Sequence, residues 1–221
     1  MATGVLPVFV RRATRAVEFF EHAEKTYETV LRLGITTDTE DRTGTVLSER
    51  DVSFTEGQLQ EALEAFRGEI RQVPPMYSAL KVNGQKLCDL ARRKGKTVER
   101  QPRPVTIHEL TLVERGENTL RLRVRCSKGT YIRTLCKDIG ETLDCGGCMD
   151  SLLRISAGEY TISEAVPLQT LLDTEEPEAY LRGVDTMFRN YPAATLTANQ
   201  ETRCRNGNPF SVSLTPGTYR A

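Results

Sequence analysis

The stretch "NTLRLRVRCSKGTYIRTLCKDIGETL" (residues 118–143) changes its apolar period halfway along. In its first half, apolar and arginine side chains alternate, which is the two-residue period of a strand with one buried face. In its second half, apolar side chains recur at three- and four-residue intervals, which predicts an amphipathic helix. The strand face comprises Leu120, Leu122, Val124 and Cys126, and the helical stripe comprises Ile132, Leu135, Cys136, Ile139 and Leu143. A strand that leads directly into a helix predicts a mixed architecture.

Segments upstream of this stretch extend the same pattern. Thr55 has Gln58 three residues later, in the spacing of a capping box, so a helix is predicted to begin there. After Tyr160 the periodic signals weaken. Further strands are predicted at 5–10, 25–34, 45–54 and 103–115, and further helices at 11–22 and 85–95. The sequence therefore predicts an α+β fold with a mixed, mainly antiparallel sheet flanked by helices.

The overall composition sets few limits on function. The 221-residue chain balances 30 Lys and Arg against 30 Asp and Glu, so a nucleic-acid partner must be argued from local patches. No apolar run is long enough to span a bilayer, and the N-terminus lacks the basic region of a secretory signal, so we expect no membrane partner. Six scattered cysteines favour reduced thiols and a cytoplasmic location.

The junction between the predicted strand and helix at 125–134 is attractive to anions. The start of a helix presents free N–H groups and a partial positive charge. Lys128 and Arg133 add charge there, and Arg133 can bind a carboxylate or phosphate in fork geometry. The glycine spacing is not that of a Walker-type phosphate loop. The alternative is a solvated strand face followed by an ordinary capped helix.

A second basic cluster lies at 91–104. Its cations are Arg92, Arg93, Lys94, Lys96, Arg100 and Arg103. Together with the Arg121, Arg123 and Arg125 row, it suggests a cationic surface suited to the RNA backbone. Charge runs are more often simply solvated surface.

Three further groups of residues could carry chemistry. Tyr27 and Tyr77 could stack on a splayed-out base, although a core role with a hydrogen-bonded hydroxyl is commoner. Asp38 and Asp41 could bind a cation, but capping of turns is the more usual role. Cys145 and Cys148 have metal-ligand spacing without a second pair, which makes a zinc or redox protein a remote alternative.

Five motifs resemble the TruB-type tRNA pseudouridine synthases, in the family's order and spacing. They are "ATGVLPV", "KTYETVLRLGITTDTEDRTG", "VPPMYSALKVNGQKL", "CSKGTYIRTLCKDIG" and "LLRISAGEY", and together they cover about residues 2–160. The resemblance implies a pseudouridine synthase catalytic domain at 1–172. It also implies a partial, PUA-like RNA-binding domain at 185–221. The implied activity is isomerisation of uridine 55 in the T-arm of tRNA, by a monomer that needs neither metal nor organic cofactor.

The resemblance also assigns residues. Tyr27 is implied to stack on the flipped base and to take part in removing the carbon-5 proton, while Arg133 pairs with the nucleophilic aspartate. The leucine near the base maps to Leu152 or Leu153. The implied substrate-binding residues are Lys25, Tyr77, Lys81, Lys128, Tyr131, Leu152 and Arg154. An arginine that keeps a carboxylate ionised makes that carboxylate usable as a nucleophile at neutral pH.

One departure from the family pattern concerns the nucleophile. In the family, "ATGVL" directly follows the segment that holds the nucleophilic aspartate, which would lie two residues before Met1. We therefore expect an N-terminally truncated chain without turnover, and an empty place beside Arg133 where a carboxylate would sit. The alternative function is a non-catalytic module that binds tRNA and helps it to fold.

Overall fold

The structure is a computed structural model that describes residues 2–82, 84–94 and 98–220, with the side chains of 92–94 left undescribed. The chain divides into two units, which are treated separately here. Unit 1 comprises residues 1–9 and 17–165, and unit 2 comprises residues 10–16 and 166–221. No helix of the described residues is long and apolar enough to cross a membrane.

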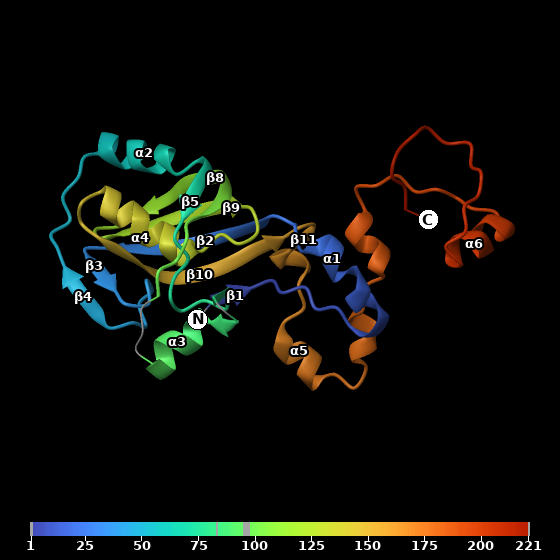
Figure 1. The fold of residues 1–221 in the computed structure, drawn as a ribbon, viewed down its shortest axis with the longest axis horizontal. Helices are drawn as coiled ribbons and strands as arrows, with labels where there is room; N and C mark the ends of the chain where they lie inside the picture. The colour runs from blue at the N-terminus through green and yellow to red at the C-terminus, as the bar shows by residue number, and fades with distance from the viewer. Residues whose placement is uncertain (1, 83, 95–97, 221) are drawn as a thin grey trace. The chain divides into compact units, whose positions relative to one another are not determined.

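Unit 1 contains a twisted sheet in the order β1-β10-β2-β9-β8-β5, with β11 added to β10 (Figure 1). Its strands are β1 (Ala2–Gly4), β10 (Gly147–Ala157), β2 (Lys25–Leu33), β9 (Thr119–Cys126), β8 (Arg103–Arg115), β5 (Gly68–Gln72) and β11 (Tyr160–Thr161). Only β1 and β10 pair in parallel, and the other neighbours are antiparallel. The predicted α+β class with a mainly antiparallel sheet is confirmed.

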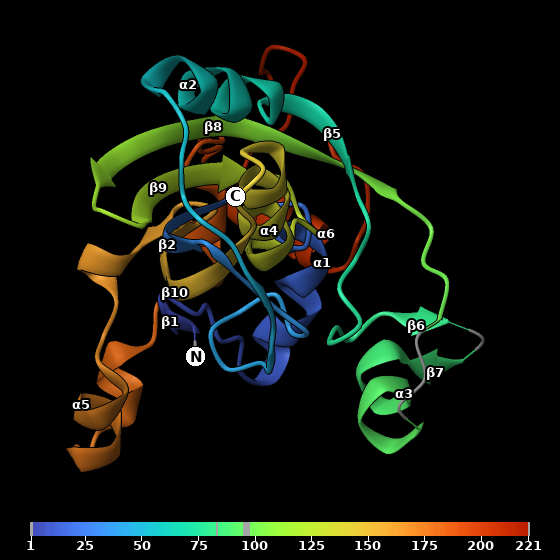
Figure 2. The ribbon, with the colours of Figure 1, turned by 90° about the vertical axis from the view of Figure 1, so that its left-hand side faces the viewer.

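Two helices share the core with this sheet (Figure 2). They are α2 (Glu56–Ala65) and α4 (Ile132–Thr142). The predicted capping box is present, because the Thr55 hydroxyl accepts from the Gln58 N–H and the Gln58 side chain accepts from the Thr55 N–H. The core joins apolar side chains of both helices to β2, β8 and β9, including Leu31, Leu59, Leu63, Leu110, Leu120, Leu122, Leu135 and Ile139. The strand half and the helical half of residues 118–143 therefore pack into the same core.

The N-terminal strand differs from the expectation. The strand is Ala2–Gly4 rather than 5–10, and hydrogen bonding to β10 continues only as far as Val5, whose N–H donates to the Arg154 carbonyl. Beyond that residue the backbone has no ladder partner, and Leu6 and Val8 are 68% and 72% exposed. The apolar run alone mispredicted the strand because a strand also requires a neighbour to pair with.

Shorter elements complete unit 1. The hairpin β3 (Ile35–Thr37) and β4 (Val46–Glu49) brackets a loop at 38–45, and β3 contacts β10. A second hairpin, β6 (Lys81–Val82) and β7 (Gln85–Lys86), precedes α3 (Leu87–Lys94). The helix predicted at 85–95 is thus α3, and its predicted end at Gly95 lies outside the described residues. Unit 1 also holds α1 (Val17–Phe20) and η2 (Ile162–Glu164).

Unit 2 consists of short helices and irregular segments. Its elements are η1 (Arg11–Ala16), α5 (Leu168–Asp173), η3 (Pro177–Tyr180), η4 (Val184–Phe188) and α6 (Ala198–Arg205). The helix predicted at 11–22 is therefore replaced by a 3₁₀ segment followed by the four-residue α1.

Candidate active site

Arg133 is placed by the first turn of α4. The helix begins after Tyr131, whose extended backbone makes it the N-cap. The buried Gln72 fixes this residue from β5, because its Oε1 accepts from the Tyr131 N–H at 3.0 Å and its Nε2 donates to the Tyr131 carbonyl at 3.3 Å. Arg133 is the second residue of the helix, and its side chain is 26% exposed. The predicted junction of strand and helix therefore forms as the sequence indicates.

The partner of Arg133 is Asp41, from the loop at 38–45. Nη1 of Arg133 lies 3.3 Å from Oδ2 of Asp41 and 3.5 Å from the carbonyl of Thr39. The expectation of an empty place beside Arg133 is therefore wrong, because this loop folds back and supplies a carboxylate. The position of Asp41 in a polar loop gave no indication of that contact.

Asp41 is also held by its own loop. Its Oδ1 accepts hydrogen bonds from the hydroxyls of Thr39 and Thr43, at 2.9 and 2.6 Å, and from the Thr43 N–H at 3.0 Å. Burial by itself would raise the pKa of Asp41, but these hydrogen bonds and the charge of Arg133 outweigh it, so the pKa lies below its ordinary value. The turn-capping role predicted for Asp38 and Asp41 is confirmed, since Asp38 accepts from the Thr45 N–H at 2.8 Å.

Tyr27 comes from the middle of the sheet. It lies in β2, opposite Val124 of β9 and Arg154 of β10. Its side chain is half-buried and packs against the core. Burial, followed by the Cys126 thiol, raises the pKa of the Tyr27 hydroxyl, while the neighbouring Arg154 guanidinium opposes that rise. The phenol is therefore protonated at neutral pH.

These three side chains line one cavity of about 440 Å³. Its volume lies within the range of ordinary small-ligand sites. The lining comprises Ala2, Tyr27, Asp41, Arg42, Thr43, Thr130, Tyr131, Ile132, Arg133, Met149, Asp150, Ser151 and Leu152. Of the residues that the sequence assigned to the site, the cavity brings together Tyr27, Tyr131, Arg133 and Leu152.

The other predicted site residues are not among those that line this cavity. Lys25 donates to the Ala23 carbonyl at 2.5 Å, and Lys128 lies 3.2 Å from His22. Arg154 donates to the Val5 carbonyl at 2.6 Å and also lies near the hydroxyl of Tyr27. Tyr77 is half-buried in the segment before β6, and Lys81 is exposed in β6.

The arginine row of β9 is paired with carboxylates. Arg121 lies 3.0 Å from Glu114, Arg123 lies 2.7 Å from Glu28, and Arg125 lies 2.7 Å from Glu24. The suggestion of a cationic RNA surface on this strand is therefore not supported, because neighbouring strands and loops supply a counter-charge for each arginine. Of the second basic cluster, 92–97 have no described side chains, Arg100 donates to the Pro74 carbonyl, and Arg103 is exposed.

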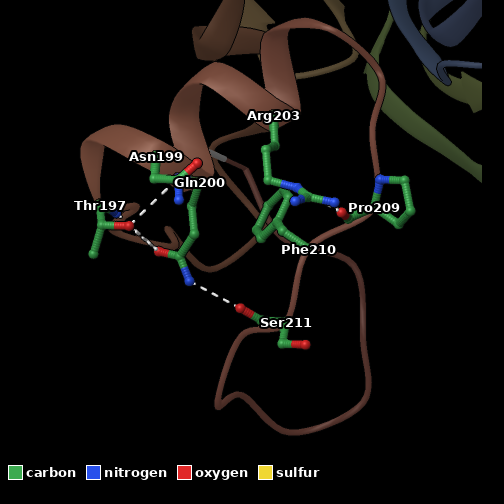
Figure 3. Close-up of a pocket in the computed structure, with 7 residues that line it drawn as sticks. All are labelled: Thr197, Asn199, Gln200, Arg203, Pro209, Phe210 and Ser211. Carbon is green, nitrogen blue, oxygen red and sulfur yellow. Dashed lines mark hydrogen bonds between the residues drawn. The ribbon is translucent and has the colours of Figure 1, made fainter.

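Unit 2 contains a separate polar cavity of about 580 Å³ (Figure 3). Its lining comprises Thr197, Asn199, Gln200, Arg203, Pro209, Phe210 and Ser211. Hydrogen bonds within the lining join Gln200 to Thr197 and Ser211, and Arg203 to Pro209. No residue that lines this cavity carries a carboxylate, whereas the cavity in unit 1 contains Asp41 beside Arg133.

The cysteine pair considered as a metal or redox site lies inside the core. Cys145 and Cys148 are each 1% exposed, in the turn between α4 and β10 and at the start of β10. Burial raises the pKa of both thiols. Within the described part of the chain, no three His, Cys, Asp or Glu side chains are grouped so as to hold a metal ion.

Two family models together match residues 1–187 of the chain. Residues 1–132 match the family described as "TruB family pseudouridylate synthase (N terminal domain)", and residues 133–187 match "tRNA pseudouridylate synthase B C-terminal domain". The chain is 47% identical over 220 residues to tRNA pseudouridine synthase B of Ralstonia pickettii, covering 97% of this chain and 69% of the relative. It is 44% identical over 207 residues to the protein of the same name from Clostridium kluyveri, covering 94% and 71%.

Structural comparisons agree on the fold. A structure described as "Crystal Structure of a Cbf5-Nop10-Gar1 Complex" matches with a TM-score of 0.64 at 24% identity, over 87% of this chain and 51% of the other. Another, "Structure of H/ACA RNP bound to a substrate RNA containing 2'-deoxyuridine", matches with a TM-score of 0.61 at 21% identity. This chain spans about half the length of those two proteins.

Proposed function

Because this chain belongs to the TruB family of pseudouridylate synthases, we propose that its target is uridine 55 in the T-arm of tRNA. The family isomerises uridine in tRNA to pseudouridine, and RNA is accordingly its partner. The observation that carries the proposal is the convergence of Tyr27, Asp41 and Arg133 on one cavity. We also propose that the protein acts as a monomer.

The cavity suits a base that has left its stack. Unstacking a base costs a few kcal/mol, and stacking on an aromatic side chain returns about 1–3 kcal/mol. Tyr27 offers a half-buried ring, and Leu152 lies opposite Thr29 in the neighbouring strand, on the same cavity wall.

We assign Asp41 to holding Arg133 rather than to attacking the uridine. Three hydrogen bonds already occupy its Oδ1, and Oδ2 faces the guanidinium. The other carboxylate in the lining, Asp150, lies 3.7 Å from Arg42. We therefore propose that this chain binds the T-arm without isomerising its uridine.

A second candidate role follows from the same pair. Asp41 is an ionised carboxylate in the cavity, oriented by an arginine, and those are the properties that a nucleophilic aspartate requires. In that case residues 1–221 would turn over uridine, and Asp41→Asn would abolish the reaction.

The remaining assignments concern the C-terminal region and the cellular location. We propose that 185–221 contributes RNA contacts, because its cavity combines Arg203, Phe210 and two amide side chains. Arginine and aromatic side chains together are typical of single-strand recognition. A cytoplasmic location fits the cysteines, all of which are free thiols.

The test uses a T-arm hairpin that carries tritium on carbon 5 of the target uridine. Residues 1–221 should bind this hairpin with an affinity that falls steeply with salt, and should release no tritium. Tyr27→Leu should weaken binding about 5- to 150-fold, whereas Tyr27→Phe keeps the ring and should retain the affinity. Absence of binding would refute the proposed function. Tritium release that is lost in Asp41→Asn would establish the second candidate role instead.

A further inference from the structure

The loop at 38–45 contains an acidic side chain that the proposed chemistry does not use. Glu40 is only 9% exposed, and its φ of +62° lies in the left-handed region, where glutamate is uncommon. A buried carboxylate without partners is strongly unfavourable. The burial of Glu40 and its positive φ therefore require surrounding residues that hold it in this conformation.

The partners of Glu40 lie on α4, beside Arg133. The hydroxyl of Thr134 donates to Oε2 of Glu40 at 2.6 Å, and Nζ of Lys137 lies 3.6 Å from Oε1. Thr134 is 1% exposed and directly follows Arg133 in the helix. Thr134 and Lys137 are three residues apart and so lie on one helical face. The Glu40 carboxylate therefore fixes the loop to the first turns of α4.

The backbone around Glu40 is attached to β10 on the other side. Its carbonyl accepts from the Met149 N–H at 3.0 Å, and the Arg42 N–H donates to the Met149 carbonyl at 2.9 Å. Asp41 is the residue between these two attachments. Its direction toward Arg133 thus depends on the conformation that Glu40 adopts.

We propose that Glu40 is a positioning residue for the candidate active site: by binding Thr134 and Lys137, its carboxylate holds Asp41 against Arg133. This inference rests on the proposed function, in which Asp41 holds Arg133 in the cavity that receives the uridine. Glu40 itself does not line the cavity. It adjoins the site through Asp41, the next residue in the chain, and through Met149, a lining residue whose N–H donates to the Glu40 carbonyl.

The experiment compares two T-arm hairpins, one with the target uridine and one abasic at that position. For the wild type, the ratio of the two dissociation constants measures recognition of the base. Glu40→Ala should lower this ratio at least fivefold. Glu40→Gln should lower it less than twofold, because the amide oxygen still accepts from Thr134. Ala62→Gly, in the core-facing side of α2, is the destabilised control and should leave the ratio unchanged.

An RNA-independent measurement separates this inference from the proposed function. The coupling between Asp41 and Arg133, measured by a double-mutant cycle of unfolding, should fall by more than half in Glu40→Ala and stay constant in Ala62→Gly. If the wild type binds the uridine hairpin and the abasic hairpin with equal affinity, the proposed function is wrong. In that case the coupling free energy between Asp41 and Arg133 still tests the role of Glu40. Unchanged coupling in Glu40→Ala, or an equal loss in Ala62→Gly, would overturn it.

Glu40→Ala could leave a protein that does not fold, so a second pair of variants makes the same test from α4. Thr134→Ser keeps the hydroxyl and should retain both the binding ratio and the coupling. Thr134→Val removes the hydroxyl with little change of volume and should lower both. Equal behaviour of the serine and valine variants would overturn the inference.

Discussion

The pair of Asp41 and Arg133 should show a measurable coupling free energy. Their side chains are 19% and 26% exposed, so the pair is neither surface nor core. Exposed pairs are worth about 0.2–1 kcal/mol, and breaking a fully buried pair costs about 3–5 kcal/mol. We therefore expect Asp41→Asn and Arg133→Gln to couple by about 1–2 kcal/mol. A double-mutant cycle of urea unfolding measures this value.

The coupling should also depend on pH in a defined direction. The pKa of Asp41 is lowered in the folded protein, below the ordinary value of 3.8. A lowered pKa stabilises the fold above the unfolded-state value, and this contribution is lost as the pH falls through the folded-state value. The coupling should therefore be constant near neutral pH and shrink as the pH falls past the ordinary value of 3.8 toward the lower folded-state value.

A surface pair offers the matched control. Nη1 of Arg50 lies 3.0 Å from Oε2 of Glu141, and both side chains are about 40% exposed. The cycle of Arg50→Gln and Glu141→Gln should give less than about 1 kcal/mol. The reasoning is refuted if Asp41 and Arg133 couple no more strongly than this control pair, or if their coupling survives acidification.

Three other outcomes are expected. Arg123→Gln should leave both the affinity for the T-arm hairpin and its salt dependence unchanged, because Glu28 already pairs with Arg123; a shallower salt slope would contradict this. Thr55→Ala should lower the free energy of unfolding by about 1 kcal/mol, measured with urea, because it removes the capping box; no change would contradict this. A thiol reagent at neutral pH should modify the exposed Cys204 before the buried Cys136, because burial raises the pKa of the Cys136 thiol to about 12. Peptide mass spectrometry can measure the order of modification. The opposite order would count against the buried core.

Local periodicity predicted most of the central fold. The alternation of 25–34 and of 118–127 gave β2 and β9, and residues 103–115 form β8 with those bounds. The motifs identified the family that the comparisons confirm. The N-terminal strand was misplaced because pairing with β10 depends on residues about 150 positions away.

The candidate site was harder to predict because its contacts are distant in sequence. Arg133 was assigned from its helix, but Asp41 is 92 positions away and has the composition of an ordinary turn. Glu40 carries no motif, and its burial follows from contacts with α4 that only the fold creates. The arginine row likewise appeared cationic until other strands and loops supplied glutamates.

The most direct test of the account is to find where the target base lies in the complex. A T-arm hairpin with 4-thiouridine at the target position can be photo-crosslinked to residues 1–221, and the attached peptide identified by mass spectrometry. The account predicts attachment within the cavity lining, at Tyr27 or beside Leu152. Attachment confined to the unit 2 cavity around Phe210, or to the paired arginine face of β9, would contradict it.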